Sequence, residues 1–313
     1  MSTSIPDTPA QVAPSSLAAK TPWRTLLGRV DWPLALFLAA WFLAVVVPLL
    51  GVVVYSFFET KSFFTVYTPS FNTWASIFDS GRFEVILRTL RIAFTVTAVE
   101  LVLAFAFSLW LAKGCASRTV KAMTLALMTV PFFLDLSSRT IIWRALLGEN
   151  GPLIPLFIGV GLVEPDSAGI LYSEWAVHFG MIIALFPTMM LPVYIAISLV
   201  DDALIDASND LGASPWQTLT GVIIPLSLPG VIAGVLFTLG SAMAAWVEPS
   251  MLGGGFVNLL SNSIESAYSA LRYPVLAALT TLIMLILGVL VLAFVLIGRR
   301  FGDLSSSFRI LRS

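Results

Sequence analysis

Six long apolar stretches dominate the pattern of hydrophobic and polar positions along the chain. A helix needs about 20 predominantly apolar residues to cross a hydrocarbon core of about 30 Å. Backbone polar groups cannot stay unpaired in lipid, and these stretches are too long for barrel strands. We therefore predict an all-α integral membrane protein with six transmembrane helices, at Trp32–Phe58, Leu90–Leu111, Ala122–Leu146, Trp175–Val200, Leu228–Ser250 and Val275–Ile297.

Composition supports lipid as the main solvent of the chain. Hydrophobic residues make up 58% and charged residues 11%, whereas soluble proteins have about a quarter of their residues charged. The formal net charge is −1, which gives no overall attraction for nucleic acid, so we exclude that partner. Cys115 is the only cysteine, so neither an intrachain disulfide nor a thiolate metal cluster can form. We predict no metal site.

The distribution of basic residues predicts the orientation. With six spans both termini share one side of the membrane, and cytoplasmic segments carry the excess of Lys and Arg. Cytoplasmic termini place ten of the 17 basic residues inside and seven outside or at helix ends. We expect a disordered cytoplasmic tail at 1–30, rich in Ser, Pro and Ala, because it has no apolar core of a signal peptide. The transmembrane domain then spans 31–298, and a cytoplasmic C-terminal tail spans 299–313.

The segment between the fourth and fifth spans departs from the charge rule. Residues 201–229 contain no Lys or Arg but four aspartates, although this loop is predicted to be cytoplasmic. Leu204, Leu211, Trp216 and Leu219 recur among polar residues with helical spacing. Pro215 resets the chain direction. We predict two short helices lying at the membrane surface.

This loop carries the most specific motif of the sequence. It has Asp206-Ala-Ser-Asn-Asp-Leu-Gly212, then nine residues, then Val222-Ile-Ile-Pro225. The spacing resembles the signature of ABC-importer permeases, which has Glu-Ala-Ala, three residues, Gly, nine residues and Ile-x-Leu-Pro. Asp replaces Glu, Ser replaces the second Ala, and two apolar residues are exchanged. Further stretches within roughly 85–297 resemble the spermidine/putrescine-type permeases; they include 138–151, 191–194, 225–230 and 248–254.

The resemblance implies that this loop is a coupling helix seated in a cleft of a cytoplasmic ATPase. Small residues at 207 and 208 allow close approach to a partner, and a glycine at 212 can adopt the positive φ that ends a helix. Two aspartates four residues apart lie on one helix face, where they can meet basic residues of the partner. The candidate coupling residues are Asp206, Ala207, Ser208, Asp210, Gly212 and Pro225. The alternative is an ordinary acidic loop helix.

The resemblance also implies partners and a location. The partners are a cytoplasmic ATPase dimer, which binds ATP and Mg²⁺, a second and different permease, and an extracytoplasmic substrate-binding protein. The location is the bacterial inner membrane. The sequence has no phosphate-binding Gly-x-x-x-x-Gly-Lys-Ser/Thr loop, so this chain is not the ATPase. It also has no obvious catalytic motif. A secondary transporter would explain six spans but not the spacing of the loop.

Ionisable residues within spans are candidates for a substrate path, because charges are costly in lipid. The candidates are Glu100, Asp135 and Glu248, with Trp246 and Tyr194 as aromatic neighbours. Carboxylates and aromatic faces suit a cation such as a polyamine. Asp135 and Arg139 can instead neutralise each other, and the aromatic residues can instead be interfacial anchors. Opines and amino-acid derivatives remain alternative substrates.

We interpret two further features as structural. Gly230 and Gly234 form a Gly-x-x-x-Gly pair that predicts close helix packing in the fifth span. His178 is the only histidine, and it has no carboxylate or histidine neighbour in sequence with which to bind a metal or act as a base. We assign it no function.

Overall fold

A computed structural model describes residues 32–61, 64–79, 82–115, 117–161 and 170–301. The predicted tail at 1–30 and residues 302–313 of the predicted C-terminal tail lie outside these ranges. The chain divides at Gly51 into two compact units. The first unit contributes most of helix α1, and the second unit contains all the other elements.

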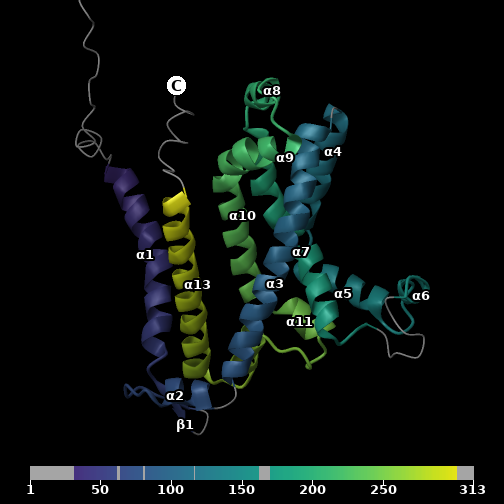
Figure 1. Cartoon of the computed structure of the whole chain (residues 1–313). Helices are drawn as coiled ribbons and strands as arrows, with labels where there is room; N and C mark the ends of the chain where they lie inside the picture. Colours follow the sequence, from purple (N-terminus) through teal and green to yellow (C-terminus); the bar gives the residue numbers. More distant parts are fainter. Residues whose placement is uncertain (1–31, 62–63, 80–81, 116, 162–169, 302–313) are drawn as a thin grey trace, which may run out of the picture. The chain divides into compact units, whose positions relative to one another are not determined.

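Helices account for almost all of the described secondary structure (Figure 1). A hairpin of two short antiparallel strands, which pairs Glu59 with Val66, is the exception. The elements in order are α1 (Trp32–Tyr55), β1 (Glu59–Lys61), β2 (Phe64–Val66), α2 (Asn72–Asp79), α3 (Arg82–Leu109), η3 (Trp110–Gly114), α4 (Arg118–Thr129), η4 (Val130–Phe133), α5 (Leu136–Leu147), α6 (Ile154–Gly159), α7 (Glu174–Ser198), α8 (Asp202–Asp210), α9 (Pro215–Thr218), η5 (Leu219–Ile223), α10 (Ile224–Ala244), α11 (Val247–Leu252), α12 (Leu260–Ser269) and α13 (Tyr273–Phe301).

The helices support the six predicted spans, with a break in the third. Five helical stretches within the described ranges are long and apolar enough to cross a membrane. The sixth is a pair, Arg118–Phe133 and Leu136–Leu147, bent by 102°. The prediction of one continuous helix over 122–146 is therefore wrong. Pro131 in the 3₁₀ turn η4 has no N–H for the helical ladder. Asp135, predicted within a span, instead accepts the Ser138 N–H at 3.1 Å as the N-cap of α5.

The fifth span also differs from its prediction at both ends. Its first part, which begins at Pro215, was expected to be a separate surface helix, but Pro215–Ala244 is one long helical stretch. The π-helical turn η5 joins α9 to α10 just before Pro225, where the missing N–H favours a wider turn. At its other end the helix stops at Ala244. Glu248, predicted near the outer end of this span, lies in the separate short helix α11.

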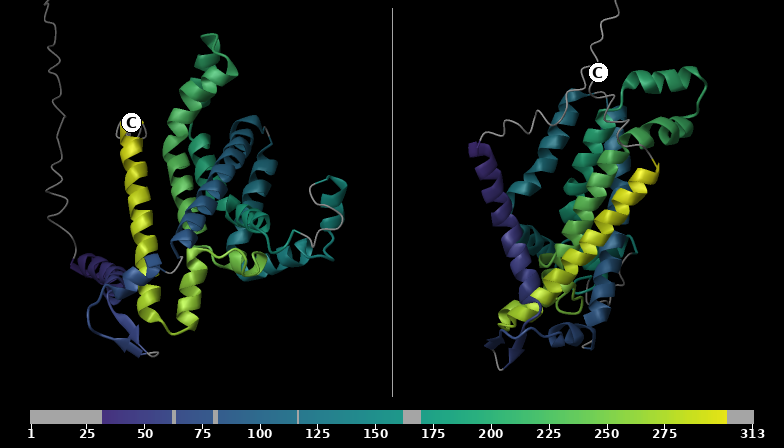
Figure 2. Two further views of the ribbon diagram at one scale, coloured as in Figure 1. Left: turned by 60° about the horizontal axis from the view of Figure 1, so that its bottom comes forward. Right: turned by 90° about the vertical axis from the view of Figure 1, so that its left-hand side faces the viewer.

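Three helices form the centre of the second unit. Helices α3, α7 and α10 pack against one another, and they lie side by side in Figures 1 and 2. Their buried residues form two apolar clusters along the helix axes, one around Met181 and Leu239 and the other around Met189 and Val235. These clusters hold the two ends of α7 and α10 in place, and the candidate coupling loop connects these helices in the chain.

Small residues set the distance between α7 and α10, as the Gly-x-x-x-Gly pair predicted. A Cβ added at Gly230 would lie 2.3 Å from the Ala196 Cβ and 2.7 Å from the Pro192 carbonyl oxygen. A Cβ at Gly234 would lie 3.1 Å from the Met189 carbonyl oxygen. The packing role predicted for this pair is confirmed. Such contacts let van der Waals packing hold two helices together in lipid, where the hydrophobic effect does not.

Gly230→Ala should separate α7 from α10, because the atoms that it meets belong to backbone and to an alanine and cannot rotate away. We expect a loss of about 1–3 kcal/mol in stability, typical of overpacking. The measurement is the thermal unfolding midpoint of the purified protein in detergent. Gly288→Ala is the matched control, because nothing lies within 4 Å of a Cβ added there. Equal midpoints for the two variants would contradict the packing assignment.

Candidate functional site

The predicted coupling helix is present as α8, and both of its ends are capped. Asp201 Oδ1 accepts the Ala203 N–H at 3.0 Å and caps the N-terminus. Gly212 has φ +80°, a conformation that glycine adopts at no steric cost. The Gly212 N–H donates to the Asn209 carbonyl, and the Ala213 N–H donates to the Ser208 carbonyl. These two bonds form a Schellman motif, so the glycine ends the helix as the sequence predicted.

A hydroxyl pair ties α8 to the start of the fifth span. Ser208 Oγ lies 3.0 Å from Thr218 Oγ1, and Thr218 is buried. Ser214 caps α9 by a capping box with Gln217. Ser208 therefore faces α9, and its side chain is partly occupied within this chain. That contact links any displacement of α8 to α10 through one continuous helical stretch.

Most of the remaining surface of α8 is exposed within the described chain, although Ile205 packs against the cluster around Met189 and Val235. Asp206, Ala207 and Asp210 are exposed, and α8 lies beyond the ends of α7 and α10 (Figures 1 and 2). Two large apolar side chains flank it, Leu211 at 89% and Trp216 at 69% exposed. Pro225 is also exposed, but it belongs to the start of α10. The combination of uncovered apolar residues and carboxylates is typical of a surface that another protein covers.

Lys113 holds the beginning of α8 by two contacts, a role that the sequence did not predict. Its Nζ donates to the Val200 carbonyl at 2.5 Å and to Asp202 Oδ1 at 2.6 Å. Hydrogen bonding and charge from Lys113 hold the pKa of the Asp202 carboxyl below its usual value. The sequence feature that could have indicated this role is the position of Lys113 at the end of the apolar stretch of the second span. The contact joins the end of α3, through η3, to the junction between α7 and α8.

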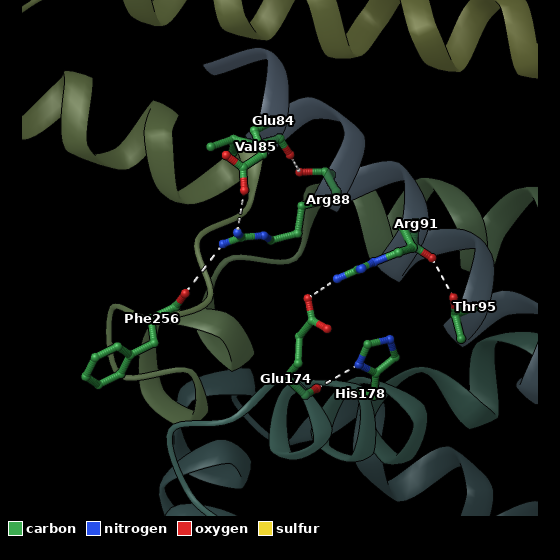
Figure 3. A network of polar contacts seen from close by, with 9 residues as sticks. Glu84, Val85, Arg88, Arg91, Thr95, Glu174, His178 and Phe256 are labelled. Carbon is green, nitrogen blue, oxygen red and sulfur yellow. Dashed lines mark hydrogen bonds and ion pairs between the residues drawn. The ribbon is translucent and has the colours of Figure 1, made fainter. Parts of the chain in front are cut away.

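A polar network joins α3 to α7 at the end opposite α8 (Figure 3). Arg91 forms an ion pair with Glu174, the first residue of α7. Arg88 pairs with Glu84 at 3.0 Å and donates to the Phe256 carbonyl. His178 Nδ1 lies 2.7 Å from the carbonyl oxygen of Glu174 on its own helix. These contacts fix the loop that follows α11, and they give His178 a local structural partner.

Glu248 is buried against helices of its own chain. It is 2% exposed, and its Oε2 has no hydrogen-bond partner among the described residues. Helix α11 packs on α5 and α7, and a Cβ added at Gly180 of α7 would lie 3.8 Å from Glu248 Cγ. The alternative that Asp135 and Arg139 neutralise each other is wrong, because Asp135 is exposed and forms no ion pair within the described ranges.

The predicted path residues come from several different helices. Glu100 is fully buried on α3, and neither carboxylate oxygen has a hydrogen-bond partner in the part of the chain that the structure describes. Tyr194 is half-buried on α7 beside the apolar cluster around Met189. Trp246 is 45% exposed, and it is more accessible than Glu100, Tyr194 and Glu248. Its carbonyl accepts the Asn262 side-chain N–H at 3.0 Å.

Known proteins resemble this chain in sequence and in fold. The chain is 31% identical over 224 residues to the spermidine/putrescine transport system permease protein PotB of Escherichia coli (strain K12), covering 71% of this chain and 80% of that protein. It is 30% identical over 235 residues to the inner membrane ABC transporter permease protein YdcU of the same organism, covering 70% and 73%. A chain of a bacterial alginate ABC transporter, solved with its alginate-bound periplasmic protein, has the same fold, with TM-score 0.71 at 18% identity over 90% of this chain and 98% of that chain.

The family comparison identifies the class of protein. Residues 104–304 match the model of the binding-protein-dependent transport system inner membrane component. This range includes the broken third span, the α8 loop and the Gly230–Gly234 packing motif. The chain is a transport permease, and it belongs to the family of binding-protein-dependent transport system inner membrane components, the membrane subunits of ABC importers.

Proposed function

We propose that this chain is one of two permease subunits of a polyamine importer, coupled through α8 to a cytoplasmic ATPase dimer. The observation that carries the coupling is the capped, largely exposed helix α8, which has the motif spacing of the family and, among the described elements, packs mainly on α9 and η5. ATP and Mg²⁺ bind to the ATPase, which supplies the energy. A substrate-binding protein delivers the cargo from the other side of the membrane, and a different permease takes the second place.

The surface of α8 suits a basic groove on the ATPase. Asp206 and Asp210 lie four residues apart and form no ion pair within the described chain, so both carboxylates can pair with Lys or Arg of a partner. Ala207 lies between them and allows close approach. Leu211 and Trp216 supply apolar contact at the end of the helix. Rim charges of this kind direct association, while buried apolar anchors hold the complex.

Motion of α8 reaches the spans by two routes in this proposal. The Ser208–Thr218 contact leads to α10, and the Lys113 contacts lead to α3. Both helices pack on α7, so a rigid displacement of the loop shifts the three central helices together. Packed helices slide or rotate as units rather than deform continuously. ATP-driven closure of the partner dimer therefore moves the bundle.

We also propose the orientation that the basic residues predict, with both termini and the α8 loop in the cytoplasm. The α12 helix and the 147–174 segment then face outward. Ser266 on α12 is exposed, so a cysteine placed there should react with a membrane-impermeant thiol reagent on intact cells. Native Cys115 should not react. The reverse pattern would refute this orientation.

The polyamine assignment rests on sequence relatedness and on acidic and aromatic chemistry. The spermidine/putrescine permease PotB matches this chain over most of its length, whereas the similar fold of an alginate transporter serves a different cargo. The fold alone therefore does not select the substrate. The test is spermidine uptake into proteoliposomes that contain this chain, its partner permease, the ATPase and the binding protein. Uptake should require ATP, whereas uptake driven by an ion gradient without the ATPase would indicate a secondary transporter.

Gly212→Val should uncouple ATP hydrolysis from uptake, because a β-branched residue is strained at φ +80° and the Schellman end of α8 is lost. Gly212→Asn is the matched control, since asparagine tolerates the left-handed conformation far better. We expect substrate-stimulated ATPase activity to fall about tenfold or more in the valine variant and to fall much less in the asparagine variant. Full stimulation in the valine variant would show that this helix end has no part in coupling.

Lys113→Met should release the start of α8 from α3 while keeping the length of the side chain. Val200 O and Asp202 then lose a charged donor, and we expect amide exchange in 202–210 to accelerate and stimulated ATPase activity to fall about fivefold. Because the pKa of Asp202 is lowered, the contact persists at neutral pH and is lost as pH falls through that lowered value. Lys61→Met, which removes the exposed pair with Glu59 far from α8, is the control. Unchanged exchange in Lys113→Met would contradict this role.

A further inference from the structure

An open pocket lies between the end of α10, α12 and the first half of α13. Its volume is about 470 Å³, and its lining includes Trp246, Glu265 and Tyr268. Leu276, Ile283 and Met284 of α13 form an apolar wall on the other side. Since α13 begins at Tyr273, Met284 lies 11 residues along it, about 16 Å at 1.5 Å per residue. The pocket therefore extends from a polar mouth into the span.

Hydrogen bonds hold the walls of this pocket in place. The Leu260 N–H donates to Thr89 Oγ1 of α3 at 2.8 Å. The Ser261 hydroxyl donates to the Ala245 carbonyl, and the Asn262 amide donates to the Trp246 carbonyl. Helix α12 is thus fixed to α3 and to the backbone that carries Trp246. A site built on fixed elements binds its ligand at a lower entropic cost.

The mouth of the pocket has the chemistry of a cation site. Glu265 is exposed and has no ion pair or side-chain hydrogen bond to any of the described residues. None of the described residues that line the pocket is a Lys or an Arg. The side chains of Trp246 and Tyr268 are 45% and 61% exposed, so their rings are accessible to an ammonium group. A carboxylate and two aromatic rings without a competing base attract organic ammonium ions.

Glu248 differs from Glu265 in its exposure and in its position relative to the pocket. It is buried at 2% exposure on α11. It is not among the residues that line the pocket. The burial of Glu248 makes it a structural residue between α5, α7 and α11 in this conformation. The accessible carboxylate in the pocket that Trp246 lines is therefore Glu265 on α12, which lies outside the predicted spans.

We propose that Trp246, Glu265 and Tyr268 form the entry subsite of this chain for an organic di- or polyammonium cargo. This inference rests on the proposed function as a polyamine importer. Glu265 pairs with one ammonium group, and the two rings contact the adjacent charge or methylene groups. The apolar wall of α13 then accommodates the methylene chain of the cargo as it moves inward.

The experiment is uptake of radiolabelled spermidine by the complete transporter in proteoliposomes. Glu265→Gln keeps the size of the side chain and removes its charge, so we expect the KM for spermidine to rise about tenfold. Glu149→Gln is the matched control, because it removes another exposed carboxylate, outside the pocket. Trp246→Phe, which keeps an aromatic face, should retain more uptake than Trp246→Leu.

The outcomes separate this inference from the proposed function. Wild-type transporter that does not take up spermidine would refute the polyamine assignment. Wild-type uptake with the same KM in Glu265→Gln and Glu149→Gln would overturn the subsite and leave the polyamine assignment standing. Equal uptake by Trp246→Phe and Trp246→Leu would overturn the aromatic part of the site. A raised KM confined to Glu265→Gln, with higher uptake in Trp246→Phe than in Trp246→Leu, would support it.

Discussion

The close contact between α7 and α10 is the constraint on which the rest of the structure depends. At one end Gly230 and Gly234 bring α10 against the backbone of α7. At the other end Gly180 of α7 leaves room for Leu252 and Glu248 of α11, the helix that follows α10. Since α8 and α9 connect α7 to α10, the same contact fixes both ends of the loop that faces the ATPase in our proposal. Lipid provides little hydrophobic drive for this association, so its small residues carry the specificity.

The polar contacts at the two ends of the bundle serve different purposes. Near α8, Lys113 and Ser208 attach a protruding helix to the central helices. At the opposite end, the Arg91–Glu174 ion pair and the hydrogen bonds of α12 hold loops against the same helices. A displacement at α8 is thus applied to a bundle whose far end carries α11 and α12. This continuity connects the proposed coupling surface with the proposed cation pocket.

The sequence predicted the features that depend on local pattern. Apolar stretches located the spans, motif spacing located α8, and the positive φ of Gly212 followed from helix-ending chemistry. It failed where tertiary packing decides. The end of α10 at Ala244 carries no strong stop signal. The break in the third span does have local signals, Pro131 and the N-cap Asp135, but the apolar content of 122–146 outweighed them in the prediction. The partners of Lys113 and the pocket around Glu265 are far apart in the chain, so no spacing rule could reveal them.

The most direct test of the proposed coupling role of α8 is to identify the chain that α8 contacts in the assembled transporter. The measurement is disulfide or short-linker cross-linking from Asp206→Cys, in a background in which Cys115→Ser removes the native thiol. We expect cross-links to the ATPase that change in yield when ATP binds. A cysteine at Tyr268, on α12, should give none to the ATPase. Cross-links from position 268 to the ATPase, or none from position 206 in an active transporter, would contradict the assignment of α8 as the coupling helix.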